Sequence, residues 1–275
     1  MGISFVILTY NSEKYIERCI HSIKRSIPGY IIANIIVVDN GSTDKTCLLL
    51  DKMNDIRAIK LPKNRGTTYS RNIAIRECNS EYIVIMDSDI EIIKVDWFHL
   101  LNQFDQMTGI IAPKLQYPDG TIQDSVKKFP KLHVRFKKYI NLLFGTSISD
   151  TEIYPELEII DFPDTAISAF WVLSQKTIKL VGLFDEIIFY SPEDVDYSAR
   201  IWGNGLVIKY YKQSEIIHHT QRISHKKPIS LISISFILNF LYYFAKHGYF
   251  FNTYKLDVIK SEVMIKYINK YGLHN

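Results

Sequence analysis

The stretch Tyr82–Ile92, YIVIMDSDIEI, decides the fold, because it joins a buried strand directly to a pair of acidic residues. Its first five residues are mostly aliphatic, and an apolar run of this length predicts a buried β-strand. Asp87 and Asp89 follow at once. Two carboxylates at the end of a buried strand repel each other and lose hydration. The stretch therefore raises the question of which ligand occupies the space between them.

Strands and helices alternate in the part of the chain before this stretch. Apolar runs and helical periodicity predict strands over 4–9, 35–38 and 56–61, and helices over 16–27, 45–53 and 69–77. Such an alternation predicts an α/β fold with a Rossmann-like, mostly parallel central sheet flanked by helices. Ligands bind to such a sheet at the carboxyl ends of its strands.

Polar residues follow each of the four predicted strands at that edge. They are Thr9 and Asn11, then Asp39, then Asn64 and Arg65, and finally Asp87 and Asp89. A loop that begins at a strand end is often polar without any function, so one such position carries little weight. Four strand ends together favour a binding site.

The spacing of Asp87 and Asp89 favours a metal site. Residues i and i+2 of an extended segment point to the same side, which turns Ser88 away. Converging carboxylates suit Mg²⁺ or Mn²⁺, and magnesium is usually held by one or two carboxylates together with substrate phosphates. The expected ligand is therefore a nucleoside diphosphate with its divalent cation. The alternative is an Asx-type turn whose carboxylates are solvated.

Composition indicates an ordinary globular protein. The 275 residues are 47% hydrophobic and 23% charged, with a formal net charge of +4. This mild excess suits phosphates or an anionic membrane surface, but it is too small to indicate nucleic-acid binding. Cys19, Cys47 and Cys78 lack metal-ligand spacing, and we expect reduced thiols in a cytoplasmic protein. The first residues, MGISFVILTY, resemble no signal peptide.

The second half is less regular. A turn is predicted at 117–121. Residues 127–160 show no pattern of secondary structure, and we expect a mobile loop there. Strands are predicted at 170–173 and 206–211, and a helix over 194–202. The tail from residue 226 to 275 contains the apolar run PISLISISFILNFLYYFA, which is short for a membrane span. We expect a helix that docks on the domain or lies at the bilayer interface, where its flanking lysines and aromatic residues would suit peripheral membrane contact.

Five blocks stand in a fixed order: VILTYNSEKYIERCIHSI, IIVVDNGSTDKT, NRGTTYSRNIAI, YIVIMDSD and GLFDEIIFYSPEDVDYSARIWGNG. Together they resemble the family 2 inverting glycosyltransferases with the GT-A fold. The last block is most similar to the bacterial rhamnosyltransferase-like branch, which builds surface polysaccharides. The resemblance covers residues 3–225 and implies a GT-A domain over 1–225. Its nucleotide-binding half would be 1–95 and its acceptor half 96–225, with 226–275 as a helical tail.

The resemblance implies a donor site in the first half of the chain. The residues that match are Thr9, Tyr10, Asn11 and Asp39 around the base and ribose, Arg71 near the pyrimidine or diphosphate, Asp87 at the ribose or metal, and Asp89 at the metal. For Asp39 the residue itself gives a reason, since a carboxylate accepts a hydrogen bond from a pyrimidine N–H or a ribose hydroxyl. Its alternative role is to cap the NGSTD turn.

A second acidic cluster, Glu193, Asp194 and Asp196, lies in SPEDVDY. A sugar hydroxyl is a weak nucleophile, so an inverting transfer needs a base opposite the leaving group. The resemblance places this base in the Glu-Asp pair, and we expect Asp194 rather than Glu193. The alternative, which suits Asp196 best, is that these acids only favour the helix dipole.

The segment EIIHHTQRIS supplies the last candidates. Relatives place a metal-binding histidine here, and we favour His218 over His219. Arg222 is a candidate for the diphosphate. Where relatives often continue with a glycine-containing stretch, this chain has TQRIS, which departs from the family pattern.

The expected reaction is metal-dependent, inverting transfer of a sugar from a nucleoside-diphosphate sugar, dTDP-rhamnose or a UDP-sugar. The acceptor would be a glycan or a polyprenyl-linked glycan, and the enzyme would be cytoplasmic or peripheral on the inner face of the cell membrane. A non-catalytic nucleotide-sugar-binding scaffold is one alternative. A sugar nucleotidyltransferase is the other, although the first strand–helix turn, TYNSEKY, lacks the glycine-rich phosphate loop expected of one.

Overall fold

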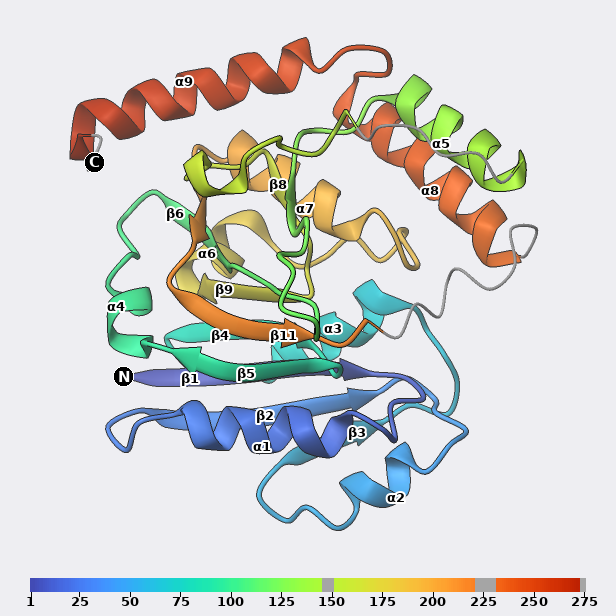
Figure 1. Ribbon diagram of the computed structural model, residues 1–275, viewed down its shortest axis with the longest axis vertical. Coiled ribbons are helices and arrows are strands. Elements are labelled where there is room, and N and C mark those ends of the chain that lie inside the picture. The colour runs from blue at the N-terminus through green and yellow to red at the C-terminus, as the bar shows by residue number, and fades with distance from the viewer. Residues whose placement is uncertain (145–150, 221–230, 273–275) are drawn as a thin grey trace.

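The computed structural model describes residues 1–144, 151–220 and 231–272. Its centre is a seven-stranded sheet with the strand order β10-β6-β9-β4-β1-β2-β3 (Figure 1). The strands are β1 (Gly2–Thr9), β2 (Ile32–Asp39), β3 (Arg57–Lys60), β4 (Tyr82–Asp87), β6 (Thr108–Pro113), β9 (Phe170–Ser174) and β10 (Val207–Tyr211). Only β9 runs antiparallel to its neighbours. The predicted α/β class with a mostly parallel, flanked sheet is confirmed.

Two short sheets accompany the central one. They pair β5 (Ile90–Val95) with β11 (Ser214–His218), and β7 (Val126–Lys127) with β8 (Thr165–Ala166). Both pairs are antiparallel. The β5–β11 pair matters for the site, because it brings the segment around residue 218 back to the turn that follows β4.

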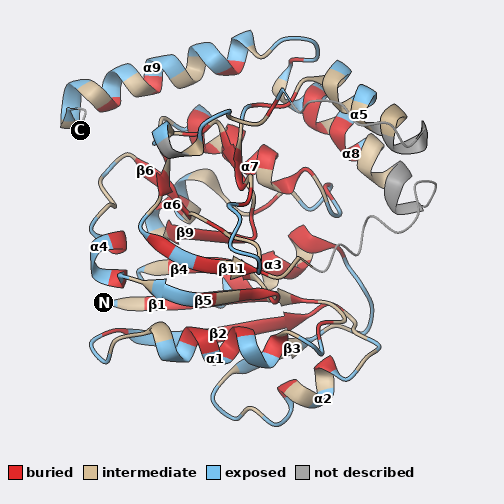
Figure 2. Cartoon of the chain, in the orientation of Figure 1, coloured by how far each residue is buried: buried red, intermediate tan, exposed pale blue. Residues whose placement is uncertain are grey.

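Helices cover both faces of the sheet. They are α1 (Ile16–Ser26), α2 (Thr46–Leu50), α3 (Thr67–Arg76), α4 (Trp97–Leu101), α5 (Leu132–Phe144), α6 (Gln175–Val181), α7 (Glu193–Gly203), α8 (Leu231–His247) and α9 (Tyr254–Tyr271), with a 3₁₀ turn η1 (Leu157–Ile159). Two hydrophobic clusters follow the alternation of strand residues. In β1, Phe5 and Ile7 pack with α1 and α4, whereas Val6 packs with α3 and α7. Figure 2 shows buried residues concentrated on the sheet and α7.

The first half follows its predicted order of strands and helices closely. No side chain caps α1, although Asn11 and Ser12 in the loop before it are residue types that often cap a helix. The Asn11 side chain instead accepts a hydrogen bond from the backbone N–H of Thr43 at 2.8 Å. It therefore ties the loop after β1 to the loop after β2.

The segment between residues 127 and 160 differs from its predicted irregular form. It contains the 13-residue helix α5, which packs against α8. Basic and aromatic residues hide the helical pattern in the sequence, because the helix gains its apolar contacts from a partner more than ninety residues away.

The tail packs on the body of the protein. Phe240, Tyr243 and Phe244 of α8 and Leu256 and Val263 of α9 belong to the same hydrophobic cluster as the central strands. None of the helices within the described ranges combines the length and apolar character that a membrane crossing requires.

Candidate active site

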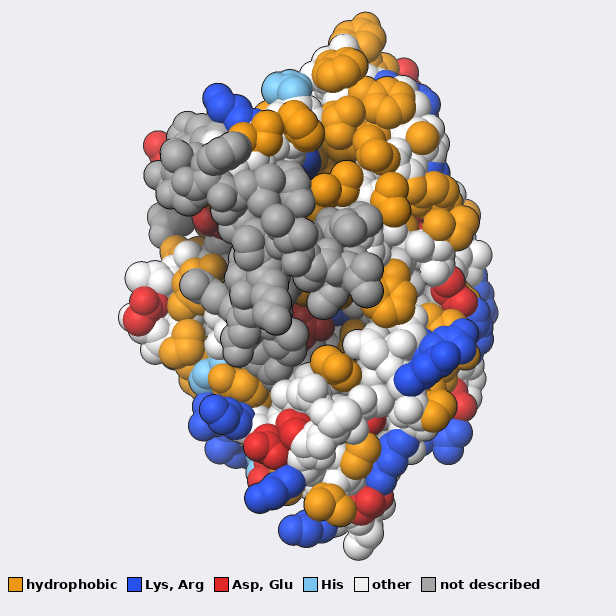
Figure 3. Space-filling view, turned by 90° about the vertical axis from the view of Figure 1, so that its right-hand side faces the viewer, with side chains coloured by type: hydrophobic (Ala, Val, Ile, Leu, Met, Phe, Trp, Pro, Cys, Tyr) orange, Lys and Arg blue, Asp and Glu red, His pale blue; other side chains and the backbone are white. Residues whose placement is uncertain are grey.

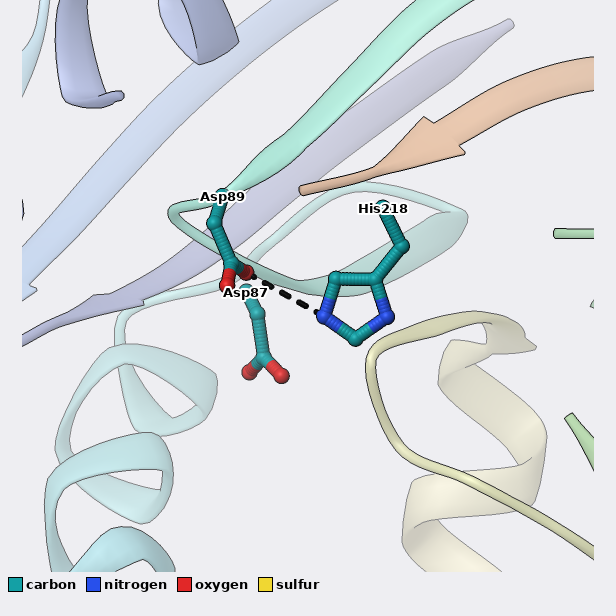
Figure 4. Close-up of side chains that lie close together, drawn as sticks. All are labelled: Asp87, Asp89 and His218. Carbon is teal, nitrogen blue, oxygen red and sulfur yellow. Dashed lines mark ion pairs between the residues drawn. The ribbon is translucent and has the colours of Figure 1, made fainter. Parts of the chain in front are cut away.

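The turn between β4 and β5 carries the two aspartates with which the sequence analysis began. Ser88, between them, is buried, and its hydroxyl lies 2.7 Å from that of Ser12. In β11, His218 pairs with Ile90, the first residue of β5. This register places His218 Nε2 3.4 Å from Asp89 Oδ1, with the Asp87 carboxylate nearby (Figure 4). Two strands distant in sequence thus bring three candidate ligands together.

These three side chains have the chemistry of a divalent-cation site. Each offers one ligand atom, and all of these atoms lie within 4.8 Å of one another. His218 Nδ1 lies 2.9 Å from Gln123 Oε1, so a proton on Nδ1 leaves the Nε2 lone pair facing Asp89. Two carboxylates and an imidazole suit Mn²⁺ well and Mg²⁺ acceptably. The residues present therefore fit the expected ion.

His219 lies outside this cluster. Its Nε2 atom is 2.9 Å from Glu91 Oε2 and 3.3 Å from Arg18 Nη1. Successive residues of an extended segment point to opposite sides, so His218 and His219 cannot both face the aspartates. Of the two candidate histidines, the structure therefore brings His218 to the aspartates and directs His219 to Glu91.

Arg71 joins the first acidic pair to the second. Its guanidinium is 2% exposed and donates from Nη2 to Asp87 at 2.7 Å and from Nη1 to Glu193 at 3.2 Å. Nη1 also donates to the Ser168 hydroxyl at 2.6 Å. Arg71, which we expected near the pyrimidine or diphosphate, lines the cavity. Its hydrogen bonds connect Asp87 to Glu193 and fix the two carboxylates relative to each other.

Glu193 and Asp194 begin α7 and face the same cavity as Asp87. Asp194 Oδ1 accepts a hydrogen bond from the backbone N–H of Val195 at 2.8 Å. The cavity has a volume of about 340 Å³. Its walls come from β1, α3, β4, α7, β11 and α8, and its lining residues include Leu8, Thr67, Arg71, Asp87, Ser168, Tyr190, Glu193, Asp194, His218 and Phe236.

Burial perturbs the acids of this cavity. It raises the pKa of Asp194, against the opposing charges of Arg135 and Lys127. Burial and the adjacent Asp194 raise the pKa of Glu193 to about 8, against the pull of Arg71. Burial likewise raises the pKa of Asp87. Shifted carboxyl groups that line one cavity are typical of a catalytic site.

Asp196, the third acid of the cluster, faces away from the cavity. Its carboxylate lies 2.7 Å from Lys246 Nζ and 2.9 Å from His247 Nε2, both at the end of α8, and 3.0 Å from Arg200 Nε. These contacts outweigh burial and lower the pKa of Asp196 to about 2. The role of Asp196 is therefore to tie the first turn of α7 to α8.

The carboxyl ends of β1 and β2 carry buried polar atoms without a partner among the described residues. They are Thr9 Oγ1 and Asp39 Oδ1. The other oxygen of Asp39 accepts from the backbone N–H of Ser42 at 3.0 Å, as a cap of the NGSTD turn would. Because a buried polar atom left unpaired is costly, the free oxygen and hydroxyl favour a polar ligand at this point. Tyr10 is half-buried beside them.

Two residues of the candidate site lie outside every motif in the sequence. Gln123 and Ser168 carry no motif, and only their contacts with His218 and Arg71 reveal them. Arg222, the candidate for the diphosphate, lies outside the described residues.

Comparison with known proteins gives a consistent result. The family model described as "Glycosyl transferase family 2" matches residues 4–152. The teichoic acid poly(glycerol phosphate) polymerase of Staphylococcus epidermidis is 34% identical over 116 residues, which are 40% of this chain but only 16% of that protein. The N-acetylglucosaminyl-diphospho-decaprenol L-rhamnosyltransferase of Mycobacterium tuberculosis is 22% identical over 260 residues, which are 88% of this chain and 84% of that protein.

A solved structure shares the fold. GalNAc-T7, crystallised with UDP, GalNAc and Mn²⁺, superposes with a TM-score of 0.65 at 15% identity. The match covers 89% of this chain and 48% of GalNAc-T7. At this identity the likeness is one of fold.

Proposed function

The chain belongs to glycosyl transferase family 2, and we propose that it transfers a sugar from a nucleoside-diphosphate sugar to a glycan or lipid-linked acceptor, with inversion at the anomeric carbon. The observation that carries the proposal is the single cavity lined by Asp87, His218, Glu193 and Asp194. It brings a cation site and a pair of candidate bases within reach of one substrate. A non-catalytic scaffold that only binds a nucleotide sugar would not need the candidate bases.

The donor would bind along the carboxyl ends of β1, β2 and β4. Thr9 and Asp39 have the unpaired atoms that a base or ribose could meet, and Asn11 fixes the loop that carries them. A divalent cation held by Asp87, Asp89 and His218 would supply positive charge to the leaving diphosphate. GalNAc-T7, which has the same fold, was crystallised with UDP and Mn²⁺, and this supports a nucleotide and a cation here.

Asp194 would remove the proton of the acceptor hydroxyl. Its raised pKa makes it a stronger base than an exposed aspartate, while its hydrogen bond from Val195 fixes its orientation. Glu193, with a pKa of about 8, would remain protonated at neutral pH and keep a second negative charge away from the departing diphosphate. Arg71 would hold both acidic pairs at a fixed separation.

The proposed donor is dTDP-rhamnose or a UDP-sugar. The mycobacterial relative is named a rhamnosyltransferase that acts on a diphospho-decaprenol-linked sugar, and it matches most of this chain. This favours rhamnose and a lipid-linked acceptor, in surface polysaccharide synthesis at the inner face of the membrane.

A thermal-shift comparison with UDP, dTDP and GDP, each with and without Mn²⁺, tests the donor site first. Ligand binding to the folded state raises the melting temperature according to affinity, so one nucleotide should stand out and should need the cation. Release of that nucleoside diphosphate from the matching sugar nucleotide then tests transfer. Release of pyrophosphate, or no nucleotide binding at all, would contradict the proposal.

A further inference from the structure

The first two turns of α5 and the middle of α8 enclose an apolar groove of about 400 Å³, apart from the catalytic cavity. Its lining residues are Leu132, His133, Arg135, Phe136, Phe236, Ile237, Phe240, Leu241 and Phe251. The α8 members stand at spacings of one and four, which places them on one face of that helix. A volume of this size lies within the range of about 300–1,000 Å³ that is typical of small-molecule sites.

Large apolar side chains remain exposed around the groove. Phe136 is 62% exposed, Leu241 43% and Phe251 70%. In Figure 3 hydrophobic side chains gather over the upper part of the face on which α5 and α8 lie. A large apolar patch on a folded protein usually marks a binding surface, since exposure to water is unfavourable.

Phe236 lines both the groove and the catalytic cavity. The two spaces are therefore adjacent, and they differ sharply in character. The cavity holds Arg71, Asp87, Glu193 and Asp194, whereas the groove is almost wholly apolar. A molecule that filled both would need a hydrocarbon part beside a polar part.

Positive charge lies where these two spaces meet. Arg135 lines the groove, with its guanidinium 4.9 Å from the centre of the Phe240 ring, and its charge acts on Asp194. The buried carboxylate of Glu152 lies 2.8 Å from both Arg135 Nη2 and Lys138 Nζ. His133 and Lys137 of α5 add two more groups that can be cationic, so the cationic groups outnumber this acid. A ligand with a hydrocarbon chain and an anionic head group would complement this arrangement, because the hydrocarbon chain suits the apolar groove and the anion suits the cationic side chains. Two copies of the protein facing each other here would instead bring like charges together.

We propose that the groove between α5 and α8 binds the hydrocarbon chain of a lipid-linked acceptor with an anionic phosphate or diphosphate head. The inference rests on the proposed function and assigns a binding place to the hydrocarbon part of its lipid-linked acceptor. The hydrocarbon chain of the lipid lies between α5 and α8, and its anionic head group contacts Arg135. The sugar attached to the head group reaches Asp194. No covalent change occurs in the groove.

Farnesyl phosphate, below the concentration at which it aggregates, is a suitable probe, with binding followed by calorimetry on the full chain. It should bind to the wild type at concentrations where inorganic phosphate does not. The substitutions Leu241→Glu and Phe136→Glu each place a charge in the groove at an exposed position and should weaken probe binding at least tenfold. Ile265→Glu, an equally exposed apolar position on α9, should leave it unchanged.

Nucleotide binding with Mn²⁺, measured on the same preparations, separates the two proposals. If nucleotide binds but farnesyl phosphate does not, or binds the groove variants as tightly as wild type, the groove proposal is wrong and the glycosyltransferase proposal stands. If farnesyl phosphate binds as expected but nucleotide does not, the groove is a lipid site but the lipid is not an acceptor.

Two other occupants give distinct results. Sedimentation with phosphatidylglycerol vesicles that depends on Leu241, without binding of the soluble probe, would assign the patch to the membrane surface. Self-association that Leu241→Glu abolishes would assign it to a second copy of the chain. Either result overturns the proposal.

Discussion

Two acidic pairs meet at the candidate site, where Asp87, Glu193 and Asp194 line one cavity, and the two pairs differ in backbone position and surroundings. Asp87 and Asp89 lie two residues apart at the end of β4, next to the imidazole of His218. Glu193 and Asp194 are adjacent on the first turn of α7, where burial raises the pKa of each. The first pair converges with His218 on a point that suits a cation, whereas the second does not belong to that cluster. Burial raises the pKa of Asp87 as well as those of Glu193 and Asp194, so backbone position, rather than pKa, distinguishes the two pairs.

Arg71 connects the two acidic pairs, because it forms an ion pair with one member of each pair. Asp87 and Glu193 take its two terminal nitrogens, whereas Asp89 lies beside His218 and Asp194 accepts a hydrogen bond from the backbone N–H of Val195. The proposed division of labour gives the cation to Asp87, Asp89 and His218 and the proton chemistry to Asp194. The predictions below test the two sides of this division separately.

The largest effect is expected from Asp194→Asn, which keeps the shape of the side chain and removes its basicity. Loss of a general base lowers kcat by about 10²–10⁴-fold. Affinity for the nucleoside diphosphate with Mn²⁺ should stay within about twofold, since Asp194 does not belong to the cation cluster. Steady-state kinetics and calorimetry check the two halves, with Asp119→Asn in an exposed turn as the matched control. Retention of wild-type kcat would remove Asp194 from the role of base.

The next effect concerns the cation site and uses the adjacent histidines as a matched pair. Loss of residues that merely support metal ligands costs about 10–100-fold in affinity. His218→Ala should therefore raise the Mn²⁺ concentration for half-maximal activity at least tenfold, as should Asp89→Asn. His219→Ala should not, because His219 contacts Glu91 and Arg18 instead. An equal effect of both histidine substitutions would contradict the assignment.

A smaller effect is expected from Asp196, the acid of SPEDVDY that faces away from the cavity. Its folded-state pKa of about 2 lies below that of the unfolded chain, so its ion pairs stabilise the protein above pH 4 and lose their effect as the pH falls from 4 to 2. The contribution is about 2 kcal/mol. Urea unfolding of wild type and Asp196→Asn should differ by about this amount at pH 7, and the difference should shrink from pH 4 towards pH 2. A constant difference would argue against this ionic origin.

Glu193→Gln should have the smallest effect on turnover at pH 7, within about tenfold. A glutamic acid with a pKa of about 8 is mostly protonated there, and glutamine resembles that neutral form. Above pH 8 the wild type gains a charge beside Asp194, so its rate should fall while that of the variant stays level. A pH profile of kcat from 6 to 9.5 measures this. A loss as large as that of Asp194→Asn would make Glu193 the base.

The sequence predicts the first acidic pair better than the second, for a physical reason. β1 to β4 alternate with short helices, and their local patterns place Asp39, Asp87 and Asp89 at one edge of the sheet. Local pattern also predicts that Ser88 turns away from the two aspartates. What local pattern cannot supply is the antiparallel return of β11, which selects His218 over His219.

The surroundings of the second pair depend on contacts between distant segments. Arg71 and Glu193 are 122 residues apart, and Asp196 and His247 are 51 apart. Helix α5 was missed altogether, and with it the groove against α8. A basic, aromatic segment looks irregular until the partner helix that buries its apolar side is known.

The most direct test of the central claim is calorimetric titration of Mn²⁺ with the preferred nucleoside diphosphate into three proteins: wild type, Asp194→Asn and Asp89→Asn. The account predicts that Asp194→Asn binds as wild type does yet fails to turn over, whereas Asp89→Asn loses at least tenfold in Mn²⁺-dependent affinity. If Asp194→Asn lost the affinity and Asp89→Asn kept it, the two acidic pairs would have the opposite tasks, and the account would be wrong.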